Sequence, residues 1–200
     1  MRVIGITGGV GAGKSTVLHM LEELCNCKII VADDVAKKIM NYGGPLTMKA
    51  LELFGEEAYG PDGELGRNHI SKMIYMDDEL REKWSNAVHP EVNKEIYGQI
   101  DAARAEGKYD FVFVEAALLI ENGYDRICDE LWYVYAPEDI RSARLMESRG
   151  YSQDKIESIF RSQMKDEEFR KHCRFVIDTG VSVECTYNTL KNKLEEYSRM

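Results

Sequence analysis

Short apolar runs alternate along the chain with longer stretches in which apolar residues recur every three or four positions. Runs rich in Val, Ile and Phe are typical of buried strands, whereas the wider spacing is typical of amphipathic helices. The pattern predicts an α/β fold in which helices cover a doubly wound, five-stranded parallel sheet. The predicted strands are residues 2–6, 28–32, 110–114, 130–135 and 174–177.

Two helical intervals interrupt this alternation. Residues 34–108 contain several amphipathic stretches and two glycine-bearing turns without a clear strand, which predicts a helical substrate-binding subdomain. Residues 138–172 are dense in Arg, Lys, Glu and Asp, and we interpret them as a helical lid. The core that carries the sheet is then expected to comprise residues 1–33, 109–137 and 173–200.

The composition is that of a soluble globular protein. Of its 200 residues 44% are apolar, and a formal charge of −9 disfavours a nucleic-acid binder, which needs a basic face. No run approaches the ~18 apolar residues of a membrane span, and the first residues lack the layout of a signal peptide. The five cysteines form no C-x-x-C pair, which indicates reduced thiols. We therefore expect a cytoplasmic monomer or weak oligomer that binds neither nucleic acid nor membranes.

The strongest chemical signal lies in GITGGVGAGKST, residues 5–16. Gly8 is followed after four residues by Gly13, Lys14 and Ser15, which is the spacing of a phosphate-binding loop, and a predicted strand and helix flank it. Lys14 is predicted to reach the β- and γ-phosphates of ATP, and the Ser15 hydroxyl to ligate Mg²⁺. The residues expected to contact the nucleotide are Gly8, Gly9, Val10, Gly11, Ala12, Gly13, Lys14, Ser15 and Thr16.

Acidic residues follow three of the predicted strands, at the edge where an open parallel sheet binds its ligand. They are Asp33 and Asp34, Glu115, and Asp178. Phosphoryl transfer needs a group that takes the acceptor's proton, and we predict that Asp33 is this base and that Asp34 caps a helix. The D-x-x-G and N-K-x-D spacings of a switch GTPase are absent from the chain. A small-molecule kinase is the simplest interpretation.

Several strings resemble the dephospho-coenzyme A kinase family. In order they are GITGGVGAGKSTV, ADDVAKKI, WSNAVHPEV, LLIE, RSQ and FVID, and their order and intervals match the family from residue 3 to about residue 185. The resemblance implies a P-loop NTPase-type core, with residues 34–108 as the coenzyme A subdomain and residues 138–172 as the lid. It also implies ATP-dependent phosphorylation of the ribose 3′-hydroxyl of dephospho-coenzyme A, the final step of coenzyme A biosynthesis.

The resemblance assigns roles that the pattern alone leaves open. It places Thr7 near the transferring phosphoryl and Thr179 beside the adenine, and it supports Asp33 as the base. The acceptor-binding residues that it implies are Asp33, Lys37, His89, Pro90, Leu118, Leu119, Glu121 and Gln163.

The chain departs from the family pattern in the lid. Ser148 stands where an arginine is usual, so we expect Arg144 or Arg149 to stabilise the charge of the γ-phosphoryl, with Arg141 as the next candidate. The other departures are Val31 for aspartate, Lys37 for arginine, Ala117 for proline and Thr179 for asparagine. Two alternative functions stay open on the sequence: another P-loop nucleoside or nucleotide kinase, and a nucleotide-binding regulator that has lost catalysis.

Overall fold

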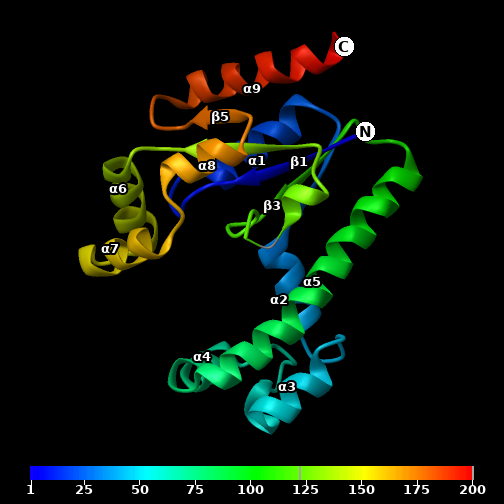
Figure 1. Cartoon of the computed structure of the whole chain (residues 1–200), viewed down its shortest axis with the longest axis vertical. Coiled ribbons are helices and arrows are strands. Elements are labelled where there is room, and N and C mark those ends of the chain that lie inside the picture. The colour runs from blue at the N-terminus through cyan, green and yellow to red at the C-terminus, as the bar shows by residue number, and fades with distance from the viewer. Residues whose placement is uncertain (122, 200) are drawn as a thin grey trace. The chain divides into compact units, whose positions relative to one another are not determined.

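The computed structural model describes residues 1–121 and 123–199 and contains a five-stranded sheet (Figure 1). The strand order is β2-β3-β1-β4-β5. The strands are β1 (Arg2–Thr7), β2 (Cys27–Val31), β3 (Phe111–Glu115), β4 (Glu130–Tyr135) and β5 (Phe175–Asp178). β1 pairs in parallel with β3 and β4, and β4 pairs in parallel with β5. The α/β fold predicted from the apolar runs is confirmed, and each predicted strand boundary lies within one residue of the observed one.

The second strand ends earlier than predicted, and this changes the setting of two candidate residues. Ala32 is the first residue of helix α2 (Ala32–Met40) and not the last of a strand, because Ala32, Val35 and Ile39 are spaced as one buried helical face. Asp33 and Asp34 therefore lie in the first helical turn, where the helix dipole favours carboxylates. The prediction that Asp33 directly follows a strand was wrong. Adjacent helical residues also diverge by about 100°, so the two side chains do not alternate across a sheet.

The turn between β1 and α1 (Lys14–Leu24) depends on glycine. Gly8 has a φ of +148°, and a Cβ atom added there would lie 2.3 Å from the carbonyl oxygen of Val134 on β4. Gly13 caps α1 with a φ of +89° in the left-handed region. The backbone can therefore run closely beside β4 and enter α1 without a side chain in the turn.

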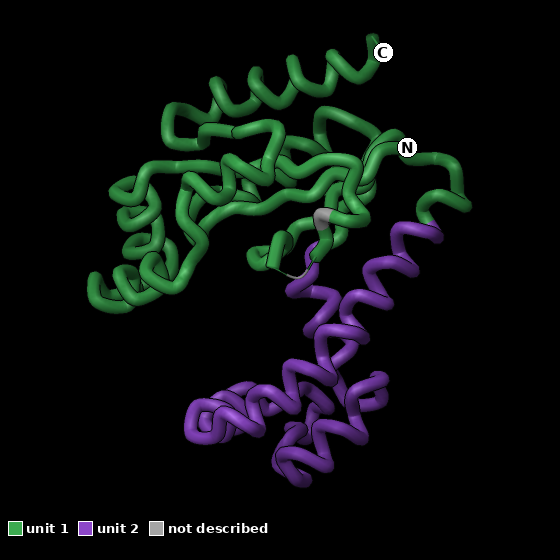
Figure 2. Tube along the Cα trace, viewed as in Figure 1, with its two compact units in different colours: residues 1–30, 103–200 green, residues 31–102 purple. Residues whose placement is uncertain are grey.

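The chain divides into two compact units, residues 1–30 with 103–200 and residues 31–102 (Figure 2). The first unit carries the sheet, and its α1 and α9 contact each other. Its further helices are η2 (Tyr124–Arg126), α6 (Glu138–Arg149), α7 (Gln153–Ser162), α8 (Asp166–His172) and α9 (Val183–Ser198). The core includes Phe113 and Trp132 on β3 and β4, whose ring centroids lie 5.6 Å apart.

The second unit is helical. It contains α2, α3 (Thr47–Phe54), η1 (Glu56–Ala58), α4 (Arg67–Met76) and most of α5 (Asp78–Glu106). Phe54 and Trp84 meet edge to face in its core, with ring centroids 5.2 Å apart. Residues 34–108, all of them described, contain no strand, only an isolated bridge between Tyr59 and Leu65.

The α6–α7 segment carries the candidate arginines of the predicted lid. α6 has Glu138 and Asp139 in its first turn and ends at Gly150, whose φ of +61° is the left-handed conformation typical of a helix end. α7 is capped by the Ser152 hydroxyl, which accepts a hydrogen bond from the backbone N–H of Lys155. The start and end of α6 and the start of α7 are therefore defined by local chemistry, and the helical period of α6 decides which of its arginines share a face.

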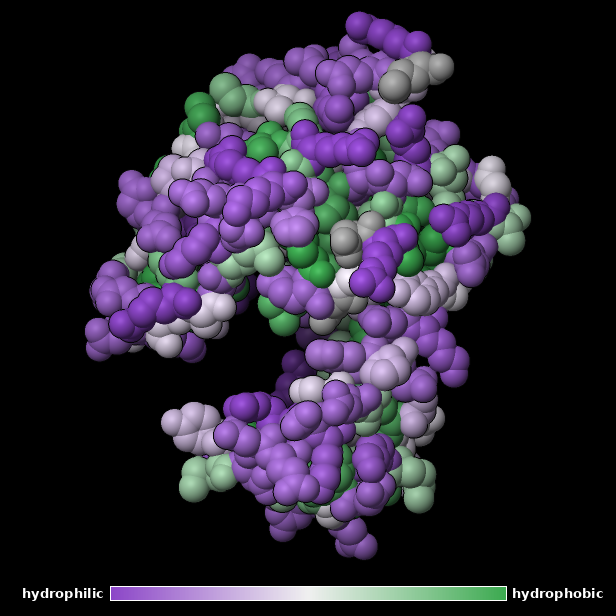
Figure 3. Space-filling view, in the orientation of Figure 1, coloured by the Kyte–Doolittle hydropathy of each residue, from purple (hydrophilic) through white to green (hydrophobic). Residues whose placement is uncertain are grey.

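The surface visible in Figure 3 is mainly hydrophilic over both units. Within residues 1–121 and 123–199, none of the helices combines the length and apolar character of a membrane span. None of the five cysteines, all in the described part of the chain, is in a disulfide.

Candidate active site

Lys14 is held over the phosphate-binding loop. Its Nζ donates to the carbonyl oxygens of Gly8 at 2.9 Å and Gly9 at 3.5 Å, and lies 3.6 Å from Glu115 Oε1. The Lys14 and Glu115 side chains are each 13% exposed. The parallel register sets Glu115 opposite Ile6, near the end of β1, which explains why the carboxylate meets the lysine. The sequence marked Glu115 only as an acid at a strand end, and the pairing with Lys14 is a finding of the structure.

Thr7 presents a buried hydroxyl directly before the loop. The residue is fully buried, and among the residues that the structure describes its Oγ1 finds no hydrogen-bond partner. A buried polar atom without a partner costs about 1–3 kcal/mol, so its retention at the end of β1 points to a partner outside the chain. The predicted role of Thr7 beside the transferring group stays a prediction.

Thr179 and Arg144 contact the second half of the loop. The Thr179 hydroxyl donates to the carbonyl of Ala12 at 2.6 Å. Arg144 donates to the Thr179 carbonyl at 2.7 Å and its hydroxyl at 3.1 Å, and reaches the carbonyl of Gly11 at 3.4 Å. The backbone N–H of Thr179 also donates to the carbonyl of Tyr135 at the end of β4, at 2.9 Å. These bonds join α6 and the end of β5 to the loop.

Arg141 and Gln163 contact the first half of the loop at Val10. Arg141 Nε donates to the Val10 carbonyl at 2.9 Å, and Arg141 Nη2 donates to Gln163 Oε1 at 2.6 Å. The same Oε1 accepts from the Val10 backbone N–H at 3.3 Å. Burial lowers the pKa of the Arg141 guanidinium, because removing a cation from water disfavours its charged form.

Arg149 lies away from this site. It is exposed, and its guanidinium lies 5.9 Å from the ring centroid of Tyr151. The reason is helical periodicity: Arg141 and Arg144 are three positions apart on one face of α6, whereas five positions rotate Arg149 about 140° from Arg144. Ser148 donates to the carbonyl of Arg144 within the helix at 2.6 Å. The two arginines of α6 that contact the loop are thus Arg141, which the sequence ranked last, and Arg144.

The segment after β3 combines a core residue with exposed ones. Leu119 is fully buried, and a Cβ atom added to Gly5 on β1 would lie 2.9 Å from its Cδ1. Leu119 therefore packs under the sheet and does not present its side chain to an acceptor, contrary to expectation. Leu118 is 54% exposed and Glu121 is also exposed.

The remaining predicted acceptor residues belong to the second unit. Asp33 is exposed in the first turn of α2, and the neighbouring Asp34 accepts from Lys37 Nζ at 2.7 Å. His89 and Pro90 are exposed on α5. Lys37 and Asp34 therefore form an ion pair with each other. The Asp33 carboxylate does not take part in this ion pair.

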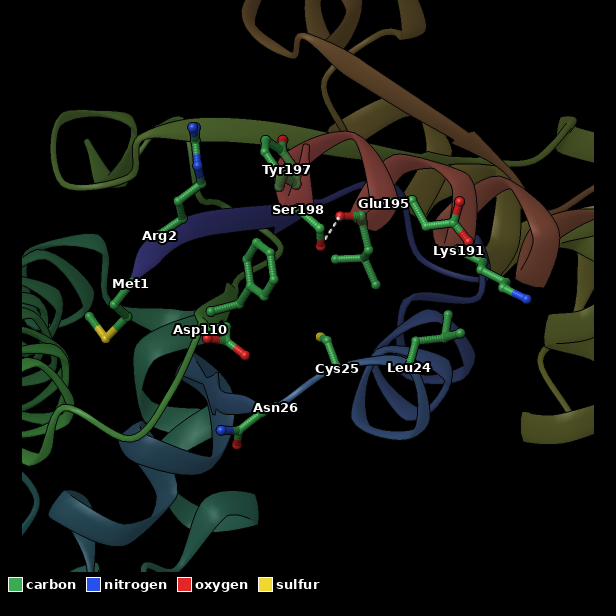
Figure 4. Close-up of a pocket in the computed structure, with 12 residues that line it drawn as sticks. Met1, Arg2, Leu24, Cys25, Asn26, Asp110, Lys191, Glu195, Tyr197 and Ser198 are labelled. Carbon is green, nitrogen blue, oxygen red and sulfur yellow. Dashed lines mark hydrogen bonds between the residues drawn. The ribbon is translucent and has the colours of Figure 1, made fainter. Parts of the chain in front are cut away.

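A cavity of about 680 Å³ lies away from the phosphate-binding loop, between the ends of β1, β3, α1 and α9 (Figure 4). It is lined by Met1, Arg2, Leu24, Cys25, Asn26, Asp110, Phe111, Lys191, Leu194, Glu195, Tyr197 and Ser198. These residues gather at the amino ends of β1 and β3, whereas the loop follows the carboxyl end of β1. Since ligands of open parallel sheets bind at the carboxyl ends, this cavity is not the phosphate site.

Known proteins resemble this chain over nearly its whole length. A family model described as dephospho-CoA kinase matches residues 2–184. A dephospho-CoA kinase from Carboxydothermus hydrogenoformans is 35% identical over 195 residues, covering 98% of this chain and 94% of that protein. TT1252 from Thermus thermophilus is 29% identical with a TM-score of 0.81, covering 98% of this chain and 97% of that one. A dephospho-CoA kinase from Campylobacter jejuni shares the fold, with 23% identity, a TM-score of 0.75, and coverage of 98% and 97%.

The different burial of Leu118 and Leu119 gives a test. We expect Leu119→Ala to lower the free energy of unfolding by about 2–5 kcal/mol, because it opens a cavity beneath β1. Leu118→Ala, its matched control, should change that free energy by only about 0.5 kcal/mol. Denaturant unfolding measures both, and equal losses would contradict the assignment of Leu119 to the core.

Proposed function

The chain belongs to the dephospho-CoA kinase family, and from that premise we propose how its own residues divide the work of the reaction. The enzyme phosphorylates dephospho-CoA at the ribose 3′-hydroxyl with ATP as the phosphoryl donor, giving CoA and ADP in CoA biosynthesis. The function that the sequence resemblance implied, phosphorylation of dephospho-coenzyme A, is thereby confirmed. The reaction requires a site for the donor phosphates, a group that accepts the hydroxyl proton and a surface that binds dephospho-CoA.

The donor site is built on the loop. When ATP binds, Lys14 Nζ exchanges the carbonyl oxygens of Gly8 and Gly9 for the β- and γ-phosphate oxygens, because an ammonium group binds phosphate more strongly than a neutral carbonyl. The backbone N–H groups of the loop and the first turn of α1 hold the phosphates, assisted by the helix dipole. Arg144 and Thr179 flank the loop on the adenine side. The observation that carries this proposal is Lys14 lying over the loop and beside Glu115.

The oxygen donors around the loop fit Mg²⁺. The Ser15 hydroxyl at the start of α1 and the Glu115 carboxylate are hard oxygen ligands of the kind that Mg²⁺ prefers. The buried Thr7 hydroxyl, which has no hydrogen-bond partner among the described residues, adds a further oxygen. Ser15 would hold the ion, with Glu115 as an acidic neighbour, and phosphate oxygens and water would complete the shell. When bound, the ion supplies neutralisation of the charge on the β- and γ-phosphates.

We assign the base to Asp33. The Asp33 carboxylate is exposed and takes no part in the ion pair between Asp34 and Lys37. It can therefore accept the proton of the 3′-hydroxyl. The second unit, which carries Asp33, also carries His89 and Pro90, and we propose that it binds the acceptor. This division gives the donor to the sheet-bearing unit and the acceptor to the helical one.

Lys14→Ala tests the donor site. Losing a charged contact to phosphate costs about 1.5–3 kcal/mol, which corresponds to a rise of about 10- to 150-fold in the dissociation constant of ATP. Turnover should collapse with it. Isothermal titration calorimetry measures the affinity, with Lys72→Ala, an exposed lysine of α4, as the control. Unchanged ATP binding in Lys14→Ala would contradict the proposal.

Asp33→Asn tests the base. General-base catalysis contributes about 10²–10⁴-fold, so kcat should fall by that range while the affinity for ATP stays nearly constant. Asp34→Asn is the matched control, since an exposed ion pair is worth only about 0–1 kcal/mol. A coupled ADP-release assay with dephospho-CoA measures both. If Asp34→Asn were the inactive variant, the assignment would pass to Asp34.

Arg144→Ala and Arg149→Ala test the face of α6. We expect Arg144→Ala to raise the dissociation constant of ATP about tenfold, because the second half of the loop loses the charged group that holds Gly11 and Thr179. Arg149→Ala should stay within about twofold of the wild type, because its side chain does not contact the loop. Calorimetry measures the affinity of both variants for ATP. A larger loss of affinity in Arg149→Ala than in Arg144→Ala would show that α6 turns a different face toward the loop.

A further inference from the structure

The peptide groups of Val10 are held from the lid side by two hydrogen bonds. The Val10 carbonyl accepts from Arg141 Nε at 2.9 Å, and its N–H donates to Gln163 Oε1 at 3.3 Å. Arg141 and Gln163 are joined to each other at 2.6 Å. The three residues come from the loop, from α6 and from the C-cap of α7, so one closed set of bonds links these three segments.

Arg141 fits this place closely. Its guanidinium lies 4.2 Å from the ring centroid of Phe160 on α7. It also lies against Gly9, where an added Cβ atom would be 2.4 Å from Nη2 and 2.5 Å from Cζ. Gly9 has no positive φ, so its backbone does not itself demand glycine. The missing side chain at Gly9 instead makes room for the guanidinium.

The chemistry of the site requires the fork of an arginine. One planar group must donate at the same time to the Val10 carbonyl and to the Gln163 side chain, in two different directions. A lysine carries the same charge on a single nitrogen and cannot reproduce this geometry from one position. The Gln163 oxygen is then oriented toward the Val10 N–H because the bond from Arg141 Nη2 fixes its amide.

We propose that Arg141 and Gln163 are a positioning pair that couples the lid to the first half of the phosphate loop and aligns it for transfer of the γ-phosphoryl. The proposal deepens the kinase function above and rests on it. Arg141 acts through Val10 and Gln163 and not as a separate charge on the phosphate. The second half of the loop, with Lys14, Arg144 and Thr179, holds the rest of the nucleotide without this pair.

Kinetics of single and double variants test the coupling. Because misplacement of reacting groups by about 1 Å can cost about 10²-fold, we expect Arg141→Met and Gln163→Met each to lower kcat about 10- to 100-fold. The double variant should be no slower than the slower single one, since residues that act as a unit give non-additive losses. The dissociation constant of ADP should stay within about twofold of the wild type, because the second half of the loop is intact. Multiplying losses in kcat would overturn the proposal, and so would an unchanged kcat.

Two further variants separate geometry from charge. Arg141→Lys keeps the charge and should lose as much kcat as Arg141→Met, whereas restoration to near the wild-type rate would overturn the positioning role. Gly9→Ala should give the same kinetic defect, because its methyl group displaces the guanidinium. The control is Arg161→Met, an exposed arginine of α7, which should match the wild type. Melting temperatures close to that of the wild type exclude misfolding as the cause.

A measurement without the acceptor separates this proposal from the proposed function. Hydrogen–deuterium exchange of the peptide that covers residues 8–13 should be faster in Gln163→Met and Arg141→Lys than in the wild type, both with and without ATP. Unchanged exchange would overturn the link between the lid and the loop, even if the kinase reaction is intact. If the wild type failed to phosphorylate dephospho-CoA, the proposed function would fall, while faster exchange in the variants would still show the link.

Discussion

The close approach of the backbone between β1 and α1 is the constraint on which the site depends. At Gly8 a single added carbon would meet the Val134 carbonyl at 2.3 Å, so the turn is possible only where no side chain is present. The turn leads into α1, and Lys14 at the start of that helix reaches back to the Gly8 carbonyl at 2.9 Å. The parallel register then brings Glu115 from β3 to the same place. Sheet geometry therefore brings a cation and a carboxylate together at the loop, and fixed charges of this kind are what phosphoryl transfer uses.

The loop is also contacted on both halves by the α6–α7 segment and the end of β5. Arg144 and Thr179 hold the second half, and Arg141 and Gln163 hold the first. The bonds from Arg141, Arg144 and Thr179 use backbone carbonyls of the loop and leave its N–H groups for phosphate, whereas Gln163 accepts from the Val10 N–H. Partial burial strengthens them, because a half-buried guanidinium has exchanged water for fixed acceptors.

Much of the fold and part of the site could be predicted from the sequence, because these depend on local pattern. Apolar runs located every strand to within one residue, and the loop spacing identified Lys14 and Ser15. Asp33 was misplaced onto a strand end because the run KIIVA continues into a helix whose buried face becomes clear only at Val35 and Ile39. The family resemblance assigned both Leu118 and Leu119 to the acceptor, but only the folded structure shows that Leu119 points into the core while Leu118 is exposed.

The sequence by itself determined that this chain carries a phosphate-binding loop between a strand and a helix, because that signal lies in adjacent residues and in the conformations that glycine allows. Only the tertiary structure decided which distant groups meet the loop. Glu115, Arg141 and Thr179 lie far from it along the chain, and they reach it through strand register, through the rotation of α6 about its axis and through the end of β5. These placements arise from the packing of whole elements, where a shift of one residue turns a side chain about 100° on a helix, so spacing in the sequence cannot resolve them.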